Sequence, residues 1–109
     1  MVEERISCSA IWYKELVLPH KVRNPTNIDK GVVVLGHRHG DIIRNVYNLL
    51  GLRSVERGEN SIGAYEQGFL TNTDRFVDRK EAAQIAMKKN QILDLSRFNE
   101  NHLYSEDLW

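Results

Sequence analysis

The chain has 109 residues, with 15 Lys or Arg and 15 Asp or Glu, so its formal net charge at neutral pH is zero. This length fits one domain, and the charge balance argues against a general nucleic-acid binder, because such proteins carry a basic excess. The single cysteine, Cys8, excludes an internal disulfide framework and a zinc ribbon. There is no sign of a signal peptide or of an apolar run of about 20 residues, the length of a membrane span, so we expect a cytosolic protein with no membrane partner.

Two strands are expected near the N-terminus. Residues 5–13 alternate in polarity, as a half-buried strand does, and one face of this strand is predicted to carry Ile6, Cys8, Ala10 and Trp12. Leu16–Leu18 is predicted to be a returning strand that ends at Pro19. The segment 20–30 is rich in Asn, Pro and Asp, which indicates a loop.

The next segment predicts a strand followed by a helix. Val32–Leu35 is short and apolar, which is typical of an interior strand. Asp41 is suited to cap an amphipathic helix that ends before Gly51, because glycine commonly occupies the left-handed position after a helix. The apolar side of this helix is predicted to comprise Ile42, Ile43, Val46, Tyr47, Leu49 and Leu50.

A long loop and a hairpin are predicted in the second half of the chain. Residues 53–65 are mostly polar and contain two glycines, so we expect a mobile loop there. Residues 68–71 and 75–77 are the predicted arms of a hairpin, and the polar residues 72–74 form its turn.

A second helix and an apolar tail complete the pattern. Asp78 lies three residues before Glu81, a spacing close to that of a capping box, so we expect the helix to begin there. Asn90 suits a left-handed end of this helix. The tail, residues 93–109, is too apolar to be free, so we expect it to pack on the domain or on a neighbouring subunit.

The segment 36–44 carries the strongest hint of chemistry, because two histidines, two arginines and two glycines gather where the predicted strand meets the predicted helix. A helix start exposes unpaired N–H groups and the positive end of the helix dipole. With Arg38, His39 and Arg44 nearby, this start predicts an anion pocket, and phosphate is the usual anion.

The same segment also matches a metal-ligand pattern. His37, His39 and Asp41 alternate, and these residue types serve as ligands in zinc and iron hydrolases. A small metal-dependent phosphodiesterase is therefore the alternative to anion binding. Further ligands would have to come from His20 or His102, the other two histidines, and Asp41 is better explained as a helix cap. We therefore predict no metal and no cofactor.

The predicted hairpin offers an aromatic side chain. Phe69 follows Gly68, and a ring beside a glycine can stack on a purine base, although such a ring is more often part of a core. Arg79 adds a second basic helix start. The chain has neither a nucleotide fingerprint nor a Gly-x-Ser-x-Gly elbow, which favours a binding protein over an enzyme.

Three pieces of the sequence, taken together, resemble one family of small phage proteins. They are the run Gly-His-Arg-His-Gly-Asp-Ile-Ile-Arg at 36–44, the residues 66–71 with 75–83, and the ending Leu-Tyr-Ser-Glu-Asp-Leu-Trp at 103–109. This set, which covers most of the chain from Val32 onward, resembles the first Thoeris anti-defence family. Members of that family are sponges that bind the cyclic ADP-ribose isomers made by bacterial TIR enzymes and so silence the host's defence signal.

The resemblance implies an α+β fold with a small antiparallel sheet and two main helices. It implies a single domain, residues 1–109, that assembles into dimers or higher oligomers, hexamers included. It also implies a nucleotide pocket. In that pocket Phe69 would stack on adenine and Arg44 would bind phosphate, with Arg97 as a second phosphate contact. Asp78, where the family often has Asn, would face the base from its other side.

We therefore expect a non-enzymatic sponge in the host bacterial cytosol. It would hold a cyclic ADP-ribose isomer without cleaving it, and oligomer symmetry would offer cyclic oligonucleotides a second site. A third interpretation is a structural or protein-binding phage module that acts through the tail from Leu95 to Trp109.

Overall fold

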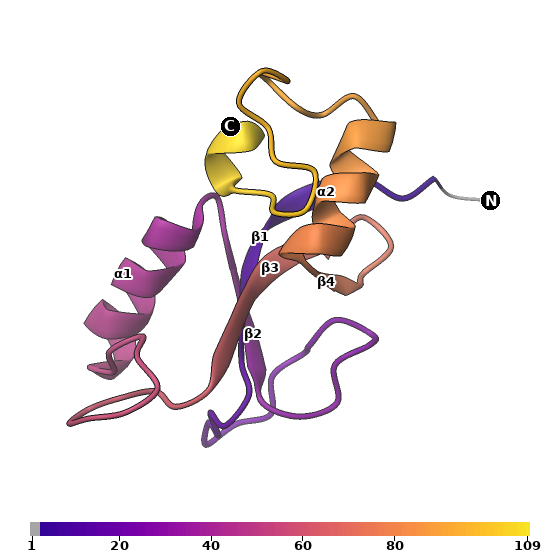
Figure 1. The fold of residues 1–109 in the computed structure, drawn as a ribbon. Helices are drawn as coiled ribbons and strands as arrows, with labels where there is room; N and C mark the ends of the chain where they lie inside the picture. Colours follow the sequence, from indigo (N-terminus) through magenta and orange to yellow (C-terminus); the bar gives the residue numbers. More distant parts are fainter. Residues whose placement is uncertain (1–2) are drawn as a thin grey trace.

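The computed structural model describes residues 3–109, which form one four-stranded antiparallel sheet flanked by two helices (Figure 1). The strand order is β2-β1-β3-β4, and the strands are β1 (Ile6–Tyr13), β2 (Val32–Gly36), β3 (Tyr65–Thr71) and β4 (Phe76–Asp78). The helices are α1 (His39–Leu50), α2 (Arg79–Lys88) and a single 3-10 turn, η1 (Ser105–Asp107). The α+β class, the antiparallel sheet and the two main helices are thereby confirmed.

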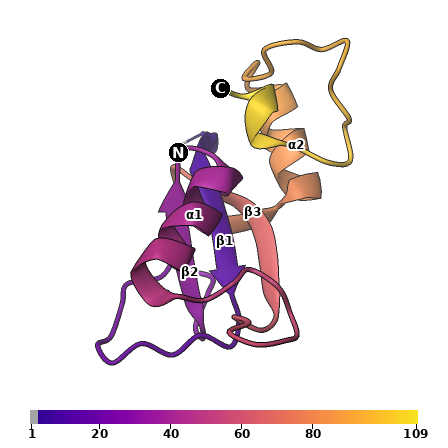
Figure 2. The same ribbon diagram turned by 90° about the vertical axis from the view of Figure 1, so that its left-hand side faces the viewer.

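Both helices cover the same face of the sheet, at different places. Figure 2 shows α1 lying across β1 and β2, while α2 and the C-terminal turn lie beyond the end of β3. Ile42 and Val46 of α1 pack on the β1 side chains Ile11 and Tyr13. The helix α2 packs its alanines on a separate cluster that contains Ile6, Phe69, Val77, Leu103 and Leu108.

The opposite face of the sheet is covered by a loop, not by a helix. Ala10, Val33 and Phe76 form its small core, and Trp12 and Ile28 pack against them. This loop is the predicted segment 20–30, so the loop prediction is confirmed.

The predicted face assignment of the first strand was wrong at its beginning. The ladder between β1 and β3 changes register between Ile6 and Cys8, which marks a β-bulge. A bulge inserts one residue and so turns the preceding side chain to the other face. Ile6 therefore lies with Phe69 under α2, whereas Ala10 and Trp12 lie on the loop-covered face.

Two further strand predictions were wrong. The segment 16–18 forms no strand, and β2 is an edge strand, not an interior one. β1 already pairs with β2 on one side and with β3 on the other, so no edge of β1 remains for Leu16–Leu18. Val17 is accordingly exposed.

The first helix begins earlier than predicted. Its N-cap is Arg38 and Asp41 lies in the first turn, so the prediction of Asp41 as the cap was wrong. The main-chain N–H of His39 donates instead to the Ser105 hydroxyl, 3.1 Å away. At most helix starts, the side chain of a neighbouring residue accepts a hydrogen bond from a free N–H group of the first turn. Here a side chain of the distant tail accepts it instead. The predicted end at Gly51 is confirmed, with a left-handed φ of 70°.

The hairpin and the second helix match their predictions. β3 and β4 pair through Phe69 and Val77, and the turn between them contains residues 72–74. Asp78 caps α2 by accepting from the N–H of Glu81 at 2.8 Å, and Asn90 has a left-handed φ of 56°.

Side-chain amides complete the sheet where a strand neighbour is missing. Asn27 donates to the carbonyl oxygen of Phe76 at 2.7 Å and accepts from its N–H at 2.8 Å. Gln91 makes the same pair of bonds with Ile6, each 2.9 Å long. Each amide takes the place of a peptide group in the ladder, so the edge at β4 and the bulged start of β1 are closed to other strands.

Candidate functional site

The C-terminal tail fills the space between the starts of the two helices. Figure 1 shows its last turn lying between the N-terminal end of α1 and the helix α2. Leu103 and Leu108 are buried in the α2 cluster, and the rings of Trp109 and His37 lie 5.2 Å apart. The tail therefore packs on its own domain in this structure.

A buried chain of polar groups holds the tail at this junction. His39 Nε2 lies 2.7 Å from the carbonyl oxygen of Gly68, which can only accept, so Nε2 carries the proton. The other ring nitrogen, Nδ1, then accepts from the Ser105 hydroxyl at 2.6 Å. The Ser105 oxygen also lies 2.9 Å from that of Ser9, a buried residue of β1. Both ring nitrogens of His39 are thus engaged within the protein.

Two of the predicted phosphate-binding arginines also hold the tail. Arg38 Nη2 donates to the main-chain oxygen of Trp109 at 2.5 Å. Arg79 Nη1 donates to the carbonyl oxygen of Leu103 at 2.6 Å, and its Nη2 donates to Gln67. The anion pocket predicted at the start of α1 is therefore occupied by the chain itself.

Acidification is expected to weaken the folded protein through His39. Burial lowers the pKa of His39 below its ordinary value of 6.5, and the nearby Arg79 lowers it further. As the pH falls below 6.5, His39 takes up a proton in the unfolded chain before it does so in the folded one. The free energy of unfolding therefore falls as the pH drops. One histidine contributes at most about 1.4 kcal/mol per pH unit. Urea denaturation at several pH values measures the slope.

Two variants separate this effect from other titrations. His39→Gln keeps one donor and one acceptor without titrating, so it is expected to flatten the slope as the pH falls below the ordinary histidine pKa of 6.5. His37→Gln is the control: it replaces an exposed histidine whose ring lies outside the network, although its main-chain oxygen accepts from Ser9, and it is expected to keep a steeper slope than His39→Gln. Arg75 lowers the pKa of Glu4 to about 2. The stability that ionised Glu4 contributes is therefore lost only as the pH falls below the ordinary glutamate pKa of 4.5. An unchanged slope in His39→Gln would refute the assignment.

Phe69 does not lie in an open pocket. Its ring is 0% exposed, packs among the aliphatic residues under α2 and meets the His39 ring edge-on at 5.0 Å. A ring with no free face cannot stack on a ligand in this structure, so the structure supports the core interpretation.

The remaining predicted residues lie apart from this junction. Asp78 uses its carboxylate to cap α2. Arg97 is exposed in the tail, and its closest carboxylate is Asp94 at 3.9 Å. Arg44 is exposed on α1 and shares no contact with Phe69. The structure thus brings together Arg38, His39, Phe69 and Arg79, but not Arg44.

Arg44 belongs to a different feature, an open depression between α1 and the loop that follows it. Its volume is about 460 Å³, and its walls are mainly apolar. It is lined by Ile43, Arg44, Tyr47, Arg53, Ser54 and Val55. Within residues 3–109, neither Arg44 nor Arg53 forms an ion pair with a carboxylate. Two exposed cations beside an apolar wall suit a ligand with an anionic end and an apolar or aromatic body.

Of the residues that line this depression, only Arg44 was assigned to a ligand site from the sequence, and Tyr47 and Arg53 are the most informative of the others. Tyr47 was placed on the apolar side of α1, yet it is 55% exposed, and so are its neighbours Leu49 (82%) and Leu50 (42%). The sheet covers only part of the helix: Ile42 and Val46 are buried in the core beside β1, and Ile43 packs against it partly buried. Arg44 and Tyr47 are three residues apart and therefore lie on one face of the helix. The sequence alone could have predicted that they lie close together. Arg53 had no such signal, because its position depends on the loop.

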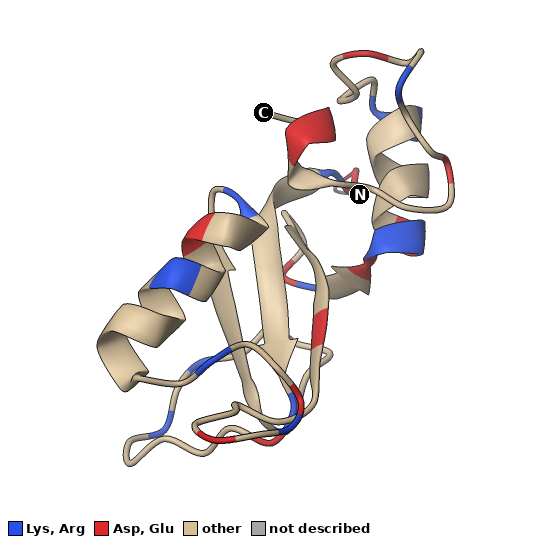
Figure 3. Ribbon diagram, turned by 60° about the vertical axis from the view of Figure 1, so that its left-hand side comes forward, with Lys and Arg blue, Asp and Glu red and all other residues tan. Residues whose placement is uncertain are grey.

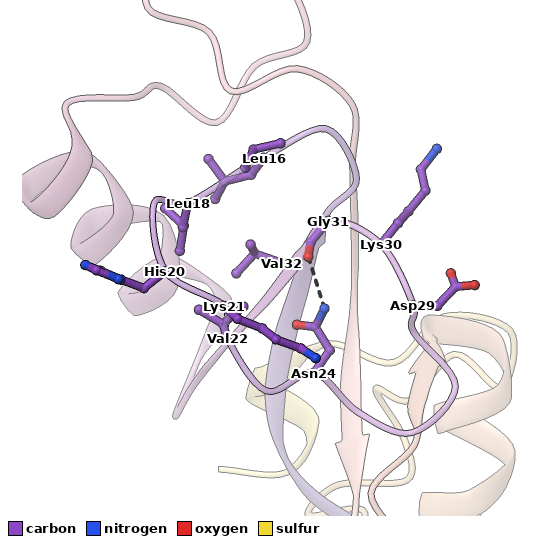
Figure 4. A pocket seen from close by; sticks show the side chains of 11 residues that line it. Leu16, Leu18, His20, Lys21, Val22, Asn24, Asp29, Lys30, Gly31 and Val32 are labelled. Atoms are coloured by element: carbon purple, nitrogen blue, oxygen red, sulfur yellow. Dashed lines mark hydrogen bonds between the residues drawn. The ribbon is translucent and has the colours of Figure 1, made fainter.

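A second pocket, of about 260 Å³, lies between the segment 16–22 and the start of β2. In Figure 4, Leu16, Leu18 and Val32 surround it, whereas the charged ends of Asp29 and Lys30 point away from it. The dashed line marks the Asn24 amide donating to Gly31 O at 3.0 Å, which fixes the loop. The charged ends of Asp29 and Lys30 thus lie outside the pocket, whereas the Lys21 side chain runs toward Asn24.

Charge is spread over the molecule. In Figure 3, blue and red segments alternate along the loops and the helices, while the strands are almost entirely tan. This mixing of the two signs along the backbone is in keeping with the zero net charge of the chain. This distribution suits a small ligand at a local cluster better than a nucleic-acid polymer.

The described residues form a small α+β domain: one antiparallel sheet, two helices on one face, and exposed arginines beside the first helix. The chain belongs to the phage T4 y16D protein family, whose family model matches residues 5–109. That match includes every strand and helix described above. Comparison with curated proteins and with solved structures finds no match.

The alternative function, a metal-dependent hydrolase, would need a group of metal-ligating side chains. In residues 3–109 no three His, Cys, Asp or Glu side chains lie close enough to hold a metal ion. His39 uses both ring nitrogens within the protein, and His37 packs against Trp109. None of the helices in the same residues has the length and apolar character needed to cross a bilayer.

Proposed function

We propose that this phage-family protein is a non-enzymatic sponge that binds a cyclic ADP-ribose isomer and sequesters it from the host's defence, in the bacterial cytosol. The observation that carries the proposal is the depression on α1, where Arg44 and Arg53 lie beside the exposed Tyr47 and form no ion pair with a carboxylate of residues 3–109. The family membership adds the phage context.

The chemistry of the depression fits such a ligand. A guanidinium group binds phosphate with two parallel hydrogen bonds, which an ammonium group cannot do. A nucleobase gains about 1–3 kcal/mol by stacking on an aromatic ring. The exposed Tyr47 ring takes the role that the sequence resemblance gave to Phe69, which is buried. The volume of about 460 Å³ lies within the usual range for small-molecule sites.

Sequestration needs affinity and abundance, not a catalytic group. A sponge consumes one site for each ligand molecule, so it lowers the free signal only when its sites outnumber the signal and its dissociation constant lies below the signalling concentration. Self-association, proposed with the sponge function, would raise the number of sites per particle, and oligomer symmetry would create the proposed second site for cyclic oligonucleotides.

Stoichiometric recovery of an intact ligand tests the proposal. The protein is incubated with a cyclic ADP-ribose isomer, separated from free ligand, and denatured by heat. We expect one intact ligand molecule per depression in the released fraction, and native mass spectrometry of the complex gives the subunit count. Turnover of the ligand into products, or a wild-type protein that retains none of it, would refute sequestration.

A further inference from the structure

A buried tyrosine is linked to the wall of the depression. Tyr13, the last residue of β1, is 0% exposed, and its hydroxyl lies 3.3 Å from the Ser54 hydroxyl. Every fully buried polar side-chain atom in residues 3–109 has a hydrogen-bond partner. Ser54 is the partner that the structure records for the Tyr13 hydroxyl, and Ser54 itself lines the depression.

The loop that bears Ser54 is anchored at its ends and loose between them. The main chain of Arg53 closes it, since the Arg53 N–H donates to the Asn60 carbonyl at 2.7 Å and the Ile62 N–H donates to the Arg53 carbonyl at 2.9 Å. Ile62 is buried in the same core as Tyr13. Residues 56–60 are all exposed, so no packing fixes the loop from outside.

Within the described residues, the contact with Tyr13 is the only side-chain hydrogen bond that joins residues 53–61 to the sheet. We propose that Tyr13 is a positioning residue for the depression. Its hydroxyl holds Ser54, and with it the neighbouring Arg53 and Val55, opposite Arg44 and Tyr47. The expected effect of Tyr13 on ligand affinity rests on the sponge function proposed above. The anchoring of the loop by Tyr13 does not depend on that function.

Removal of one oxygen atom tests the proposal. Tyr13→Phe keeps the ring in the core and removes only the hydroxyl. We expect the affinity for a cyclic ADP-ribose isomer, measured by calorimetry, to fall roughly 3- to 10-fold, the effect of one lost hydrogen bond. Ser54→Ala is expected to give a similar loss. The double variant is expected to lose no more than either single variant, because both changes break the same link.

A matched control and a readout without ligand separate positioning from general stability. Tyr65→Phe removes the hydroxyl of a tyrosine whose ring lies 6.2 Å from that of Tyr13 and packs on the same core. It is expected to leave affinity unchanged. Trypsin cuts after exposed arginines, and the loop offers Arg53 and Arg57. Looser anchoring exposes them more often, so Tyr13→Phe and Ser54→Ala are expected to be cut several-fold faster than Tyr65→Phe at equal thermal stability.

The outcomes divide cleanly. Unchanged trypsin cleavage in both Tyr13→Phe and Ser54→Ala would overturn the proposal, whatever the ligand does. If the wild-type protein does not bind the cyclic ADP-ribose isomer, the sponge function fails, and faster cleavage of the two variants still supports the positioning role. Should Tyr13→Phe fail to fold, Ser54→Ala decides alone, because Ser54 lies at the surface of the core.

Discussion

Replacing Phe69 by alanine is expected to lower the free energy of unfolding by about 3–5 kcal/mol, the usual loss when a buried phenylalanine leaves a cavity. The ring is fully buried and touches the cluster that joins β3, α2 and the tail. Small domains are stable by only about 5–15 kcal/mol, so this loss is a large fraction of the total stability. Urea denaturation followed by tryptophan fluorescence measures the loss.

Two comparisons show whether Phe69 acts through the core. Phe69→Leu retains much of the buried volume and is expected to cost less than about 1.5 kcal/mol. Phe98→Ala, at a partly buried ring beside the same cluster, is expected to cost less than Phe69→Ala. A ring that served only to stack on a ligand could be removed without loss of stability. An unchanged unfolding midpoint in Phe69→Ala, together with lost ligand binding, would therefore restore the stacking role.

Replacing Arg44 by glutamine is expected to weaken binding of a cyclic ADP-ribose isomer by roughly 10- to 100-fold while leaving stability unchanged. A hydrogen bond to a charged group contributes about 1.5–3 kcal/mol, and each 1.4 kcal/mol changes affinity tenfold. The side chain is exposed and has no carboxylate partner in the described residues, so the fold loses nothing by its removal. Calorimetry gives the affinity, and thermal unfolding gives the stability.

The matched control is Arg57→Gln, which changes the net charge by the same amount. Arg57 is exposed in the same loop as Arg53 and does not line the depression. Equal losses in Arg44→Gln and Arg57→Gln would indicate long-range charge and not a contact. Full affinity in Arg44→Gln, combined with loss in Arg79→Gln, would place the ligand at the tail junction instead. Arg44→Lys is expected to be intermediate, because it keeps the charge and loses the two-pronged geometry.

The tail junction and the depression show two uses of the same residue type. Arg38 and Arg79 donate to main-chain oxygens of the tail, so their guanidinium groups hold the tail against the domain. Arg44 and Arg53 lie on the surface and remain available to a ligand. Sequence alone does not distinguish these four arginines, and only their surroundings in the fold separate the two that bond to the tail from the two on the surface.

The sequence by itself determined the elements whose signals are local. The stop at Gly51, the cap from Asp78 to Glu81 and the hairpin from β3 to β4 each depend on residues within a few positions of one another. Such bonds form between neighbours in the chain, so the residue types and their spacing are sufficient to predict them.

The tertiary structure alone decided the features that join distant residues. Ser105 caps the start of α1 from 66 positions away, the bulge after Ile6 turns that side chain toward Phe69, and the pairing of β1 on both sides leaves no edge for Leu16–Leu18. The exposure of Tyr47 has the same origin, since the sheet covers only part of α1. Burial depends on which surfaces meet after the chain has folded, and a pattern of apolar residues cannot show which of them will find a partner.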